Sequence, residues 1–396
     1  MSVRHQCHWF ESPIGLVKTA DVVIIGGGFA GVSLLYTLSS LDPTLNVVLL
    51  EESSLGYHAS GRTLGYVKSL DDNMFRTLKN KYSEEVAMDY YRFIETSNRK
   101  LFSMVQSESI DCGLEINGGI HLASTMAESE KIQRFQSLLT EEFFTQPMSS
   151  SDLSSLVSTG RYKFGMYVPN EATLDPYKLI QELAEVTEQT GRRCITNAKV
   201  DSIYDEGDDI IIHVRNRGKI TTKNIVYCTG AYTSEFVPLV DQATVRQQHF
   251  FTTKQLPNNV SSAMSKLPIT HRDRVIRLNG NVLMACGQTL DIGSLDDGEL
   301  SQEQYDKLRH AVNAVYPDLT KRFGVDKIWT AVEVVSNDGV PFVGPVPEMP
   351  GHFMNIGHGF NGYGSAFGAA EIIAEYILTD QSINPTANLM ELEREG

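Results

Sequence analysis

The chain is poor in cysteine, and the cysteines it has are not grouped. There are five, without a CxxC pair among them: Cys7, Cys112, Cys194, Cys228 and Cys286. This spacing predicts neither a disulfide framework nor a zinc ribbon, and it suits a reducing cytosol. His5, Cys7 and His8 stand close together, but no second group of ligands accompanies them, so we expect no metal site.

Long uninterrupted apolar runs are also absent. The start, MSVRHQCHWFESPIG, lacks the apolar core of a secretory signal peptide. The run DVVIIGGGFAGVSLLYTL, residues 21–38, is broken by glycines and by Ser33, so it does not predict a membrane span. We therefore expect a soluble, cytoplasmic protein without membrane insertion.

Basic residues are in deficit. Lys and Arg number 34 against 49 Asp and Glu, which gives a formal net charge of −15 over 396 residues. This excess of acid opposes a nucleic-acid partner and favours cationic or neutral small substrates. The hydrophobic content of 41% is ordinary for a globular protein, and the length allows two domains or one large interrupted domain.

The clearest motif is a glycine fingerprint between two short apolar runs. Residues 21–25, DVVII, predict a buried parallel strand, and Gly26, Gly28 and Gly31 follow as GxGxxG before a helical pattern. The first glycine allows a tight turn, the second lets the backbone approach a pyrophosphate, and the third lets helix and strand pack closely. The pattern predicts a dinucleotide-binding unit.

The same unit offers further contacts to a dinucleotide. The helix that begins with Phe29 and Ala30 would present free N–H groups and its positive end to the phosphates. The second apolar run, NVVLL, ends at Glu51, which is placed to accept hydrogen bonds from a ribose. Glu52 is the weaker candidate, because an adjacent acid points elsewhere into solvent.

The fingerprint does not separate FAD from NAD, but the stretch after Glu52 favours a flavin. A run of small residues, ASGRTLG at 59–65, would let a flat ring lie against the backbone. Together with the fingerprint, it resembles the FAD-dependent D-amino-acid oxidase superfamily, in particular its glycine oxidase, sarcosine oxidase and γ-glutamylputrescine oxidase branch. The residues assigned to the flavin on this basis are Ser60, Gly61, Arg62, Thr63 and Leu64, with Thr63 where Asn is frequent.

The resemblance continues near the C-terminus. From Trp329 the frame reads W-x(8)-D-G-x-P-x-x-G-P, and GHGFNGYG follows at 357–364. It implies an α/β fold in which a Rossmann-like FAD-binding domain is interrupted by an α+β substrate domain with an antiparallel sheet. We assign residues 15–70, 160–235 and 326–385 to the FAD-binding domain, 71–159 and 236–325 to the substrate domain, and 1–14 and 386–396 to tails.

The resemblance also assigns the remaining cofactor residues. Val200 would hold the adenine by its backbone, and Thr229 and Gly230 would lie against the AMP half. The second glycine loop would cover the pyrimidine edge of the flavin with Phe360, Asn361, Gly362, Tyr363 and Gly364. A helix beginning at Ser365 would point its positive end at the flavin N1–C2=O region and stabilise the reduced, anionic ring.

The mode of flavin attachment also follows from the resemblance. Members that bond the flavin covalently carry a Cys or a His at positions that correspond to Ala331 and Arg62 here. We therefore expect non-covalent FAD. The stretch NVLMACGQ lacks the Lys that some oxidases of the family place over the flavin. The resemblance therefore does not decide whether the electron acceptor is oxygen or another compound.

The expected reaction is oxidation of an amine. Hydride leaves the carbon next to nitrogen for the flavin, and the imine is hydrolysed to a carbonyl compound and a smaller amine. This reaction requires no side-chain base. His249 and His358 are nevertheless candidates to receive a proton or to position the amine, and the alternative for each is a purely structural role.

One departure from the family bears on the substrate. Amino-acid-oxidising members carry WxGxRP, whose Arg clamps a carboxylate, and here that position is Glu333. A carboxylate suits an ammonium or amide instead, which favours an amine, polyamine or N-substituted amino acid. Arg246, Arg274 and Arg277 could replace the clamp, although we expect each on the surface. The alternatives are the same chemistry on a glycine-type adduct of a nucleic-acid base, or a non-catalytic flavoprotein subunit.

Overall fold

A six-stranded sheet forms the base of the molecule. The computed structural model describes residues 16–139, 143–157, 160–238, 242–292 and 301–394. The strand order is β18-β19-β12-β1-β2-β8, parallel except for the antiparallel pair β18–β19. The strands are β1 (Val22–Ile25), β2 (Val47–Leu50), β8 (Arg193–Ile195), β12 (Asn224–Tyr227), β18 (Phe342–Pro345) and β19 (His352–Ile356).

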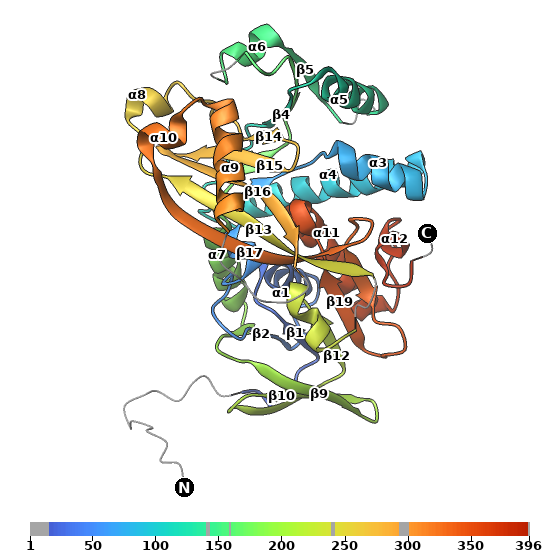
Figure 1. Cartoon of the computed structure of the whole chain (residues 1–396). Helices are drawn as coiled ribbons and strands as arrows, with labels where there is room; N and C mark the ends of the chain where they lie inside the picture. The colour runs from blue at the N-terminus through green and yellow to red at the C-terminus, as the bar shows by residue number, and fades with distance from the viewer. Residues whose placement is uncertain (1–15, 140–142, 158–159, 239–241, 293–300, 395–396) are drawn as a thin grey trace, which may run out of the picture.

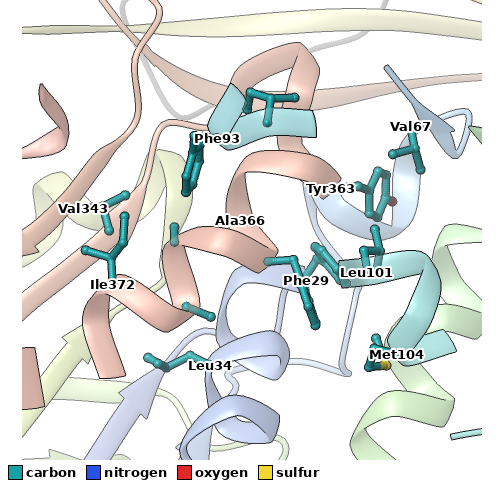
Figure 2. Packing of buried hydrophobic residues seen from close by; sticks show 14 of the residues in the cluster. Phe29, Leu34, Val67, Phe93, Leu101, Met104, Val343, Tyr363, Ala366 and Ile372 are labelled. Atoms are coloured by element: carbon teal, nitrogen blue, oxygen red, sulfur yellow. The ribbon is translucent and has the colours of Figure 1, made fainter. Parts of the chain in front are cut away.

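Helices cover this sheet and share one apolar core. They are α1 (Phe29–Leu41), α4 (Glu84–Ser107), α7 (Pro176–Glu188) and α11 (Gly362–Thr379). The helix α1 contacts α7 and α11, and α11 contacts α4. Figure 2 shows Phe29, Leu101 and Ala366, from α1, α4 and α11, within this core. Helix α7 begins at Pro176, whose ring suits the first turn, and the chain leaves helical geometry by Gly191, whose φ is 90°.

An eight-stranded sheet lies above the first one in Figure 1. Its order is β17-β13-β16-β15-β14-β4-β6-β5, antiparallel except for the pair β14–β4. Helix α9 (Gln302–Val315) packs on one of its faces. The strands are β4 (Gly119–Ala123), β5 (Gln146–Ser149), β6 (Phe164–Val168), β13 (Ala243–Thr253), β14 (Ile269–His271), β15 (Arg274–Asn279), β16 (Val282–Asp291) and β17 (Val325–Ser336).

The two sheets do not follow the predicted domain boundaries. Strands β6 and β17 belong to the eight-stranded sheet, although the sequence places both in segments of the FAD-binding domain. Conversely, α4 comes from a predicted substrate segment and packs on α11. The division into domains stays a prediction.

Two local features shape the surroundings of the glycine loop. The loop at 59–65 contains a helical turn, α2 (Ala59–Arg62), followed by β3 (Tyr66–Val67), which pairs with β7 (Ala172–Thr173). Asn197 has a φ of 52° and turns the chain between β8 and β9 (Val200–Glu206), so Val200 begins a strand.

The remaining elements are short or peripheral. A three-stranded sheet joins β9 to β10 (Asp209–Val214) and β11 (Gly218–Thr222). The other helices are α3 (Asp72–Lys81), α5 (Met126–Leu138), α6 (Ser150–Ser154), η1 (Gly230–Glu235), α8 (Asn258–Ser261), α10 (Leu319–Phe323), η2 (Gly359–Asn361) and α12 (Ala387–Met390). Within the described residues, no helix has the length and apolarity that crossing a membrane requires.

Candidate functional site

The first glycine loop is pressed against the end of β12. A Cβ on Gly26 would lie 2.4 Å from the Cys228 carbonyl oxygen, and the residue has a φ of +111°. A Cβ on Gly31 would lie 2.0 Å from the Gly26 carbonyl oxygen. Both neighbours are backbone atoms that cannot move aside, so these two glycines are required by the close packing of loop, helix and strand.

Glu51 braces this loop. Its buried carboxylate accepts hydrogen bonds from the backbone N–H of Gly27, at 2.7 Å, and of Ser53, at 2.8 Å. The sequence predicts a ribose contact for Glu51, but it does not indicate these hydrogen bonds to the backbone of the loop. Charge-assisted bonds of this kind hold the backbone of the loop in one shape.

The N-terminus of α1 is open to an anion. Its cap residue, Gly28, has no side chain to satisfy the first N–H groups, and only the Phe29 N–H is bonded to a side chain, to Ser60 Oγ at 3.0 Å. The positive end of the helix dipole and these N–H groups suit a phosphate. A Cβ at Gly28 would come 2.9 Å from Ser60 Oγ, so the space beside the helix end depends on glycine.

A first cavity of about 830 Å³ lies at these strand ends. It brings together predicted residues from four separate parts of the chain: Gly26, Gly28, Glu51, Glu52, Ser60, Val200, Thr229 and Gly230. Glu52 is exposed and pairs with Lys199 at 3.0 Å. His58 also lines this cavity, with its ring centroid 4.9 Å from that of Tyr232. The sequence carried no signal for His58 or Tyr232.

A second cavity of about 700 Å³ continues from the first, since both are lined by Gly28, Ser60 and Gly230. The predicted residues that line this second cavity are Gly28, Phe29, Ala30, Ser60, Thr63, Gly230, Glu333, His358, Gly362 and Tyr363. Together the two cavities form an elongated space for a dinucleotide with a flat ring at the far end.

Tyr363 ties the two glycine-bearing regions to each other. Its hydroxyl donates to the Ser60 carbonyl at 2.7 Å and lies 3.0 Å from Thr63 Oγ1. Its ring centroid is 5.0 Å from that of Phe29. Burial raises the pKa of this phenol above its usual value, so the hydroxyl stays a donor. The second loop therefore fixes the helical turn α2 beside the cavity.

The helix after the second loop begins earlier than predicted. It starts at Gly362 rather than Ser365, because Gly362 to Gly364 adopt helical geometry, and Asn361 at its N-cap makes no side-chain cap. The helix is therefore three residues longer than the sequence predicts, and the turn η2 leads directly into it. The side chain of Phe360 lies outside the described residues.

Gly364 meets α4 instead of the cavity. A Cβ there would lie 2.4 Å from Asn98 Oδ1. The neighbouring Ser97 hydroxyl donates to the Gly364 carbonyl and accepts from the Gly368 N–H at 2.7 Å. The glycine is thus explained by helix packing.

We expect Gly364→Ala to destabilise the protein by about 1–3 kcal/mol, because the added methyl group forces α11 away from α4. Gly362→Ala, where a Cβ meets nothing within 4 Å, is the matched control and should change stability by less than about 1 kcal/mol. Denaturant unfolding of both variants without added cofactor measures the difference. Equal free energies of unfolding would contradict the packing explanation.

His358 lines the second cavity as a neutral ring. Its Nδ1 lies 2.9 Å from Ser365 Oγ and its Nε2 lies 2.7 Å from Asn355 Oδ1. Burial lowers its pKa to about 3. An imidazole with this pKa does not take up a proton near neutral pH, which favours a positioning role over a proton acceptor.

The structure does not bring His249 to either cavity. Its fully buried ring lies within β13, with Nε2 3.0 Å from Gln247 Oε1. It is absent from the lining of both cavities. This placement supports the structural alternative for His249.

Glu333 does reach the second cavity. It lies on β17, and its Oε1 accepts a hydrogen bond from Gln248 Nε2 at 3.0 Å. Burial raises the pKa of this carboxyl from 4.5 to about 7, against the opposing effects of Gln248 and Arg246. Among the described residues that line this cavity there is no Lys or Arg.

The three arginines considered as clamps lie elsewhere. Arg246 pairs with Asp291 at 2.9 Å, and Arg274 packs against Gly287. Arg277 is buried rather than on the surface, and its guanidinium donates to the carbonyls of Leu64, Gly65 and Leu174. The prediction that Arg277 lies on the surface was wrong. Its guanidinium can be buried because three backbone carbonyls accept hydrogen bonds from it.

Gly61, Arg62 and Leu64 support the site without lining it. A Cβ on Gly61 would lie 2.1 Å from the Gly56 carbonyl, and Leu64 is buried beside Ala331. The Arg62 carbonyl accepts from Trp329 Nε1 at 2.8 Å. These contacts join the turn α2 to β17, the strand that carries Glu333.

Because the pKa of Glu333 is raised, we expect Glu333→Gln to increase the free energy of unfolding in a pH-dependent way. A carboxyl whose pKa rises from 4.5 to about 7 on folding destabilises the folded state once it ionises. The wild-type protein should lose up to about 3 kcal/mol relative to the variant as pH rises through this window. In urea unfolding at about pH 8 the variant should have the higher free energy of unfolding, and at about pH 4 the two proteins should have equal values. A constant difference across this range would disprove the raised pKa.

Metal ligands do not gather in the described part of the chain. No group of three or more His, Cys, Asp or Glu could hold an ion there. His5, Cys7 and His8 lie outside the described residues.

Comparison with known proteins agrees with this geometry. The chain is 24% identical to dimethylglycine dehydrogenase of Rattus norvegicus, over 96% of this chain and 45% of that protein. It is 25% identical to sarcosine dehydrogenase of Homo sapiens, over 89% and 39%. The chain thus spans less than half the length of these relatives.

The predicted fold class is confirmed by a solved structure. Glycine oxidase from Geobacillus kaustophilus superposes with a TM-score of 0.81 at 18% identity, over 96% of this chain and all of the other. The family model described as FAD dependent oxidoreductase, DAO, matches residues 21–376. The paired cavities, the open helix ends and this match lead to one conclusion: the chain belongs to the DAO family of FAD-dependent oxidoreductases.

Proposed function

We propose that the protein binds FAD non-covalently and oxidises the C–N bond of an amine or N-substituted amino acid. The observation that carries this proposal is the second cavity, whose described lining holds the carboxylate of Glu333 and neither Lys nor Arg. Such a cavity attracts an amine and repels the carboxylate of a simple amino acid.

The residues that line the two cavities support this proposal. The open N-terminus of α1 would hold the pyrophosphate, Glu51 the ribose, and the start of β9 at Val200 the adenine. The second cavity, with Tyr363 and the open N-terminus of α11, would hold the flavin ring. A positive helix end beside the ring favours the reduced, anionic state.

When bound, the flavin supplies the hydride acceptor. The protein's part is to hold the amine close to the ring and keep water away. Neutral His358 can donate or accept a hydrogen bond without adding charge, and the apolar neighbours Val332 and Val334 shield the cavity wall.

Non-covalent attachment is supported by the thiol nearest to both cavities. Cys228 lines each of them, and burial raises the pKa of its thiol well above the usual value. A protonated thiol is a poor nucleophile toward the flavin. Acid precipitation of the protein should therefore release all of its FAD into the supernatant.

The test is flavin reduction without oxygen. The purified protein is mixed anaerobically with primary amines, N-methylated glycines and simple amino acids, and bleaching is followed at roughly 450 nm. We expect amines to bleach the flavin and simple amino acids to leave it oxidised. Recolouring in air would identify oxygen as the electron acceptor, and a yellow protein that no compound bleaches would overturn the proposal. A cytosolic location, suggested by the scattered cysteines, is part of the same proposal.

A further inference from the structure

Glu333 is held in a fixed place and forms no ion pair within the described part of the chain. Its neighbours on β17, Val332 and Val334, are buried in the apolar core, so the strand cannot shift easily. Among the described residues, only Gln248 donates a hydrogen bond to this carboxylate. Arg246, opposite it on β13, instead pairs with Asp291 at 2.9 Å.

This arrangement favours a cation that arrives with the ligand. An ionised carboxylate in a buried site without a cationic partner is unfavourable, and a cation that enters the cavity removes that penalty. Gln248 fixes Oε1 and leaves the other oxygen without a donor among the described residues. A primary or secondary ammonium has the donors for this oxygen.

The nitrogen at Glu333 is not the one that is oxidised. Hydride leaves the carbon only when the adjacent nitrogen has a free lone pair, so the reacting amine must be neutral. A carboxylate close to an amine nitrogen favours the charged, protonated form of that amine. An ammonium paired with Glu333 therefore keeps its proton.

We propose that the substrate is a diamine or polyamine, one nitrogen of which is oxidised while a second, cationic nitrogen binds Glu333. This inference rests on the proposed function, because it names the substrate class of the same cavity. No bond forms or breaks at Glu333. The oxidation itself moves a hydride from carbon to the flavin and releases a proton from nitrogen to solvent.

Binding of matched amines tests the second contact. Putrescine and butylamine have the same carbon chain, but only putrescine has the second nitrogen. We expect putrescine to bind the FAD-loaded wild-type protein roughly 10–100-fold more tightly, as judged by the shift of the flavin spectrum or of the melting temperature without oxygen. In Glu333→Gln this preference should fall to within about threefold.

Two further variants complete the experiment. Gln248→Leu removes the bond that orients the carboxylate and should reduce the preference only in part. Glu206→Gln, exposed on β9, is the control and should keep it. Equal binding of the two amines by the wild-type protein, or an unchanged preference in Glu333→Gln, would overturn the inference.

The two proposals fail in different ways. Because binding is read from spectrum and melting temperature, the preference can be measured even if no amine reduces the flavin. If no amine reduced the flavin but the preference for putrescine held, the proposed function would be wrong, and the protein would be a flavoprotein that binds diamines. Reduction by butylamine and putrescine with equal binding would keep the function and remove the second contact.

Discussion

Replacing Gly26 by alanine should yield a protein that binds no FAD and is less stable by about 3–5 kcal/mol. The new Cβ would lie 2.4 Å from the Cys228 carbonyl oxygen, at a φ of +111° that alanine disfavours. Relief of the clash would move the loop off β12 and break the bond between Gly27 and Glu51. The absorbance ratio at roughly 450 nm to 280 nm reports FAD content, and denaturant unfolding reports stability.

Gly191→Ala separates the clash from the backbone strain. Gly191 also has a positive φ, 90°, but a Cβ there meets nothing within 4 Å. This variant should lose only about 1–2 kcal/mol and keep full FAD content. If both variants lost the same free energy, the close approach to β12 would not be the reason for Gly26.

Replacing Asp338 by alanine should cost about 3–5 kcal/mol, the second large effect that the structure predicts. The buried carboxylate accepts from Arg394 Nη2 at 2.8 Å, from Lys81 Nζ at 3.0 Å and from the Tyr82 hydroxyl at 2.8 Å. Its removal leaves the buried Arg394 guanidinium without a counter-charge. Urea unfolding measures the loss, and Asp291→Ala, in the exposed pair with Arg246, should cost no more than about 1 kcal/mol.

The effect of Asp338 should also depend on pH. Arg394, Tyr82 and Lys81 hold the pKa of this carboxyl well below its usual value. A depressed pKa contributes stability that is present above the usual Asp range and is lost as pH falls through the folded-state value. The gap between wild type and Asp338→Asn should therefore narrow in acid, and a gap that widens in acid would contradict this account.

The first cavity could be predicted because its signals are local. Gly26, Gly28, Gly31 and Glu51 stand in one stretch of a strand, a helix and a strand, and their spacing alone encodes the turn and its packing. The bracing of the Gly27 N–H by Glu51 was not visible, since it depends on the direction of one side chain.

The second cavity was less predictable because distant contacts shape it. Ser97 and Gly364 are 267 residues apart, so no spacing rule explains why this glycine is needed. Tyr363 was assigned to the flavin, but its bonds to Ser60 and Thr63 join segments that only the fold brings together. The burial of Arg277 likewise depends on three carbonyls from two other segments.

The strand order of the six-stranded sheet has a consequence for synthesis of the chain. Strand β12 has β1 on one side and β19, residues 352–356, on the other. A ribosome must therefore add residues 228–351 after β12 before the strand that becomes its second neighbour is made. Until then one edge of an apolar parallel sheet is open, and such edges pair readily with other chains. We expect the nascent protein to depend on chaperones and to fold slowly, as proteins dominated by distant pairings do.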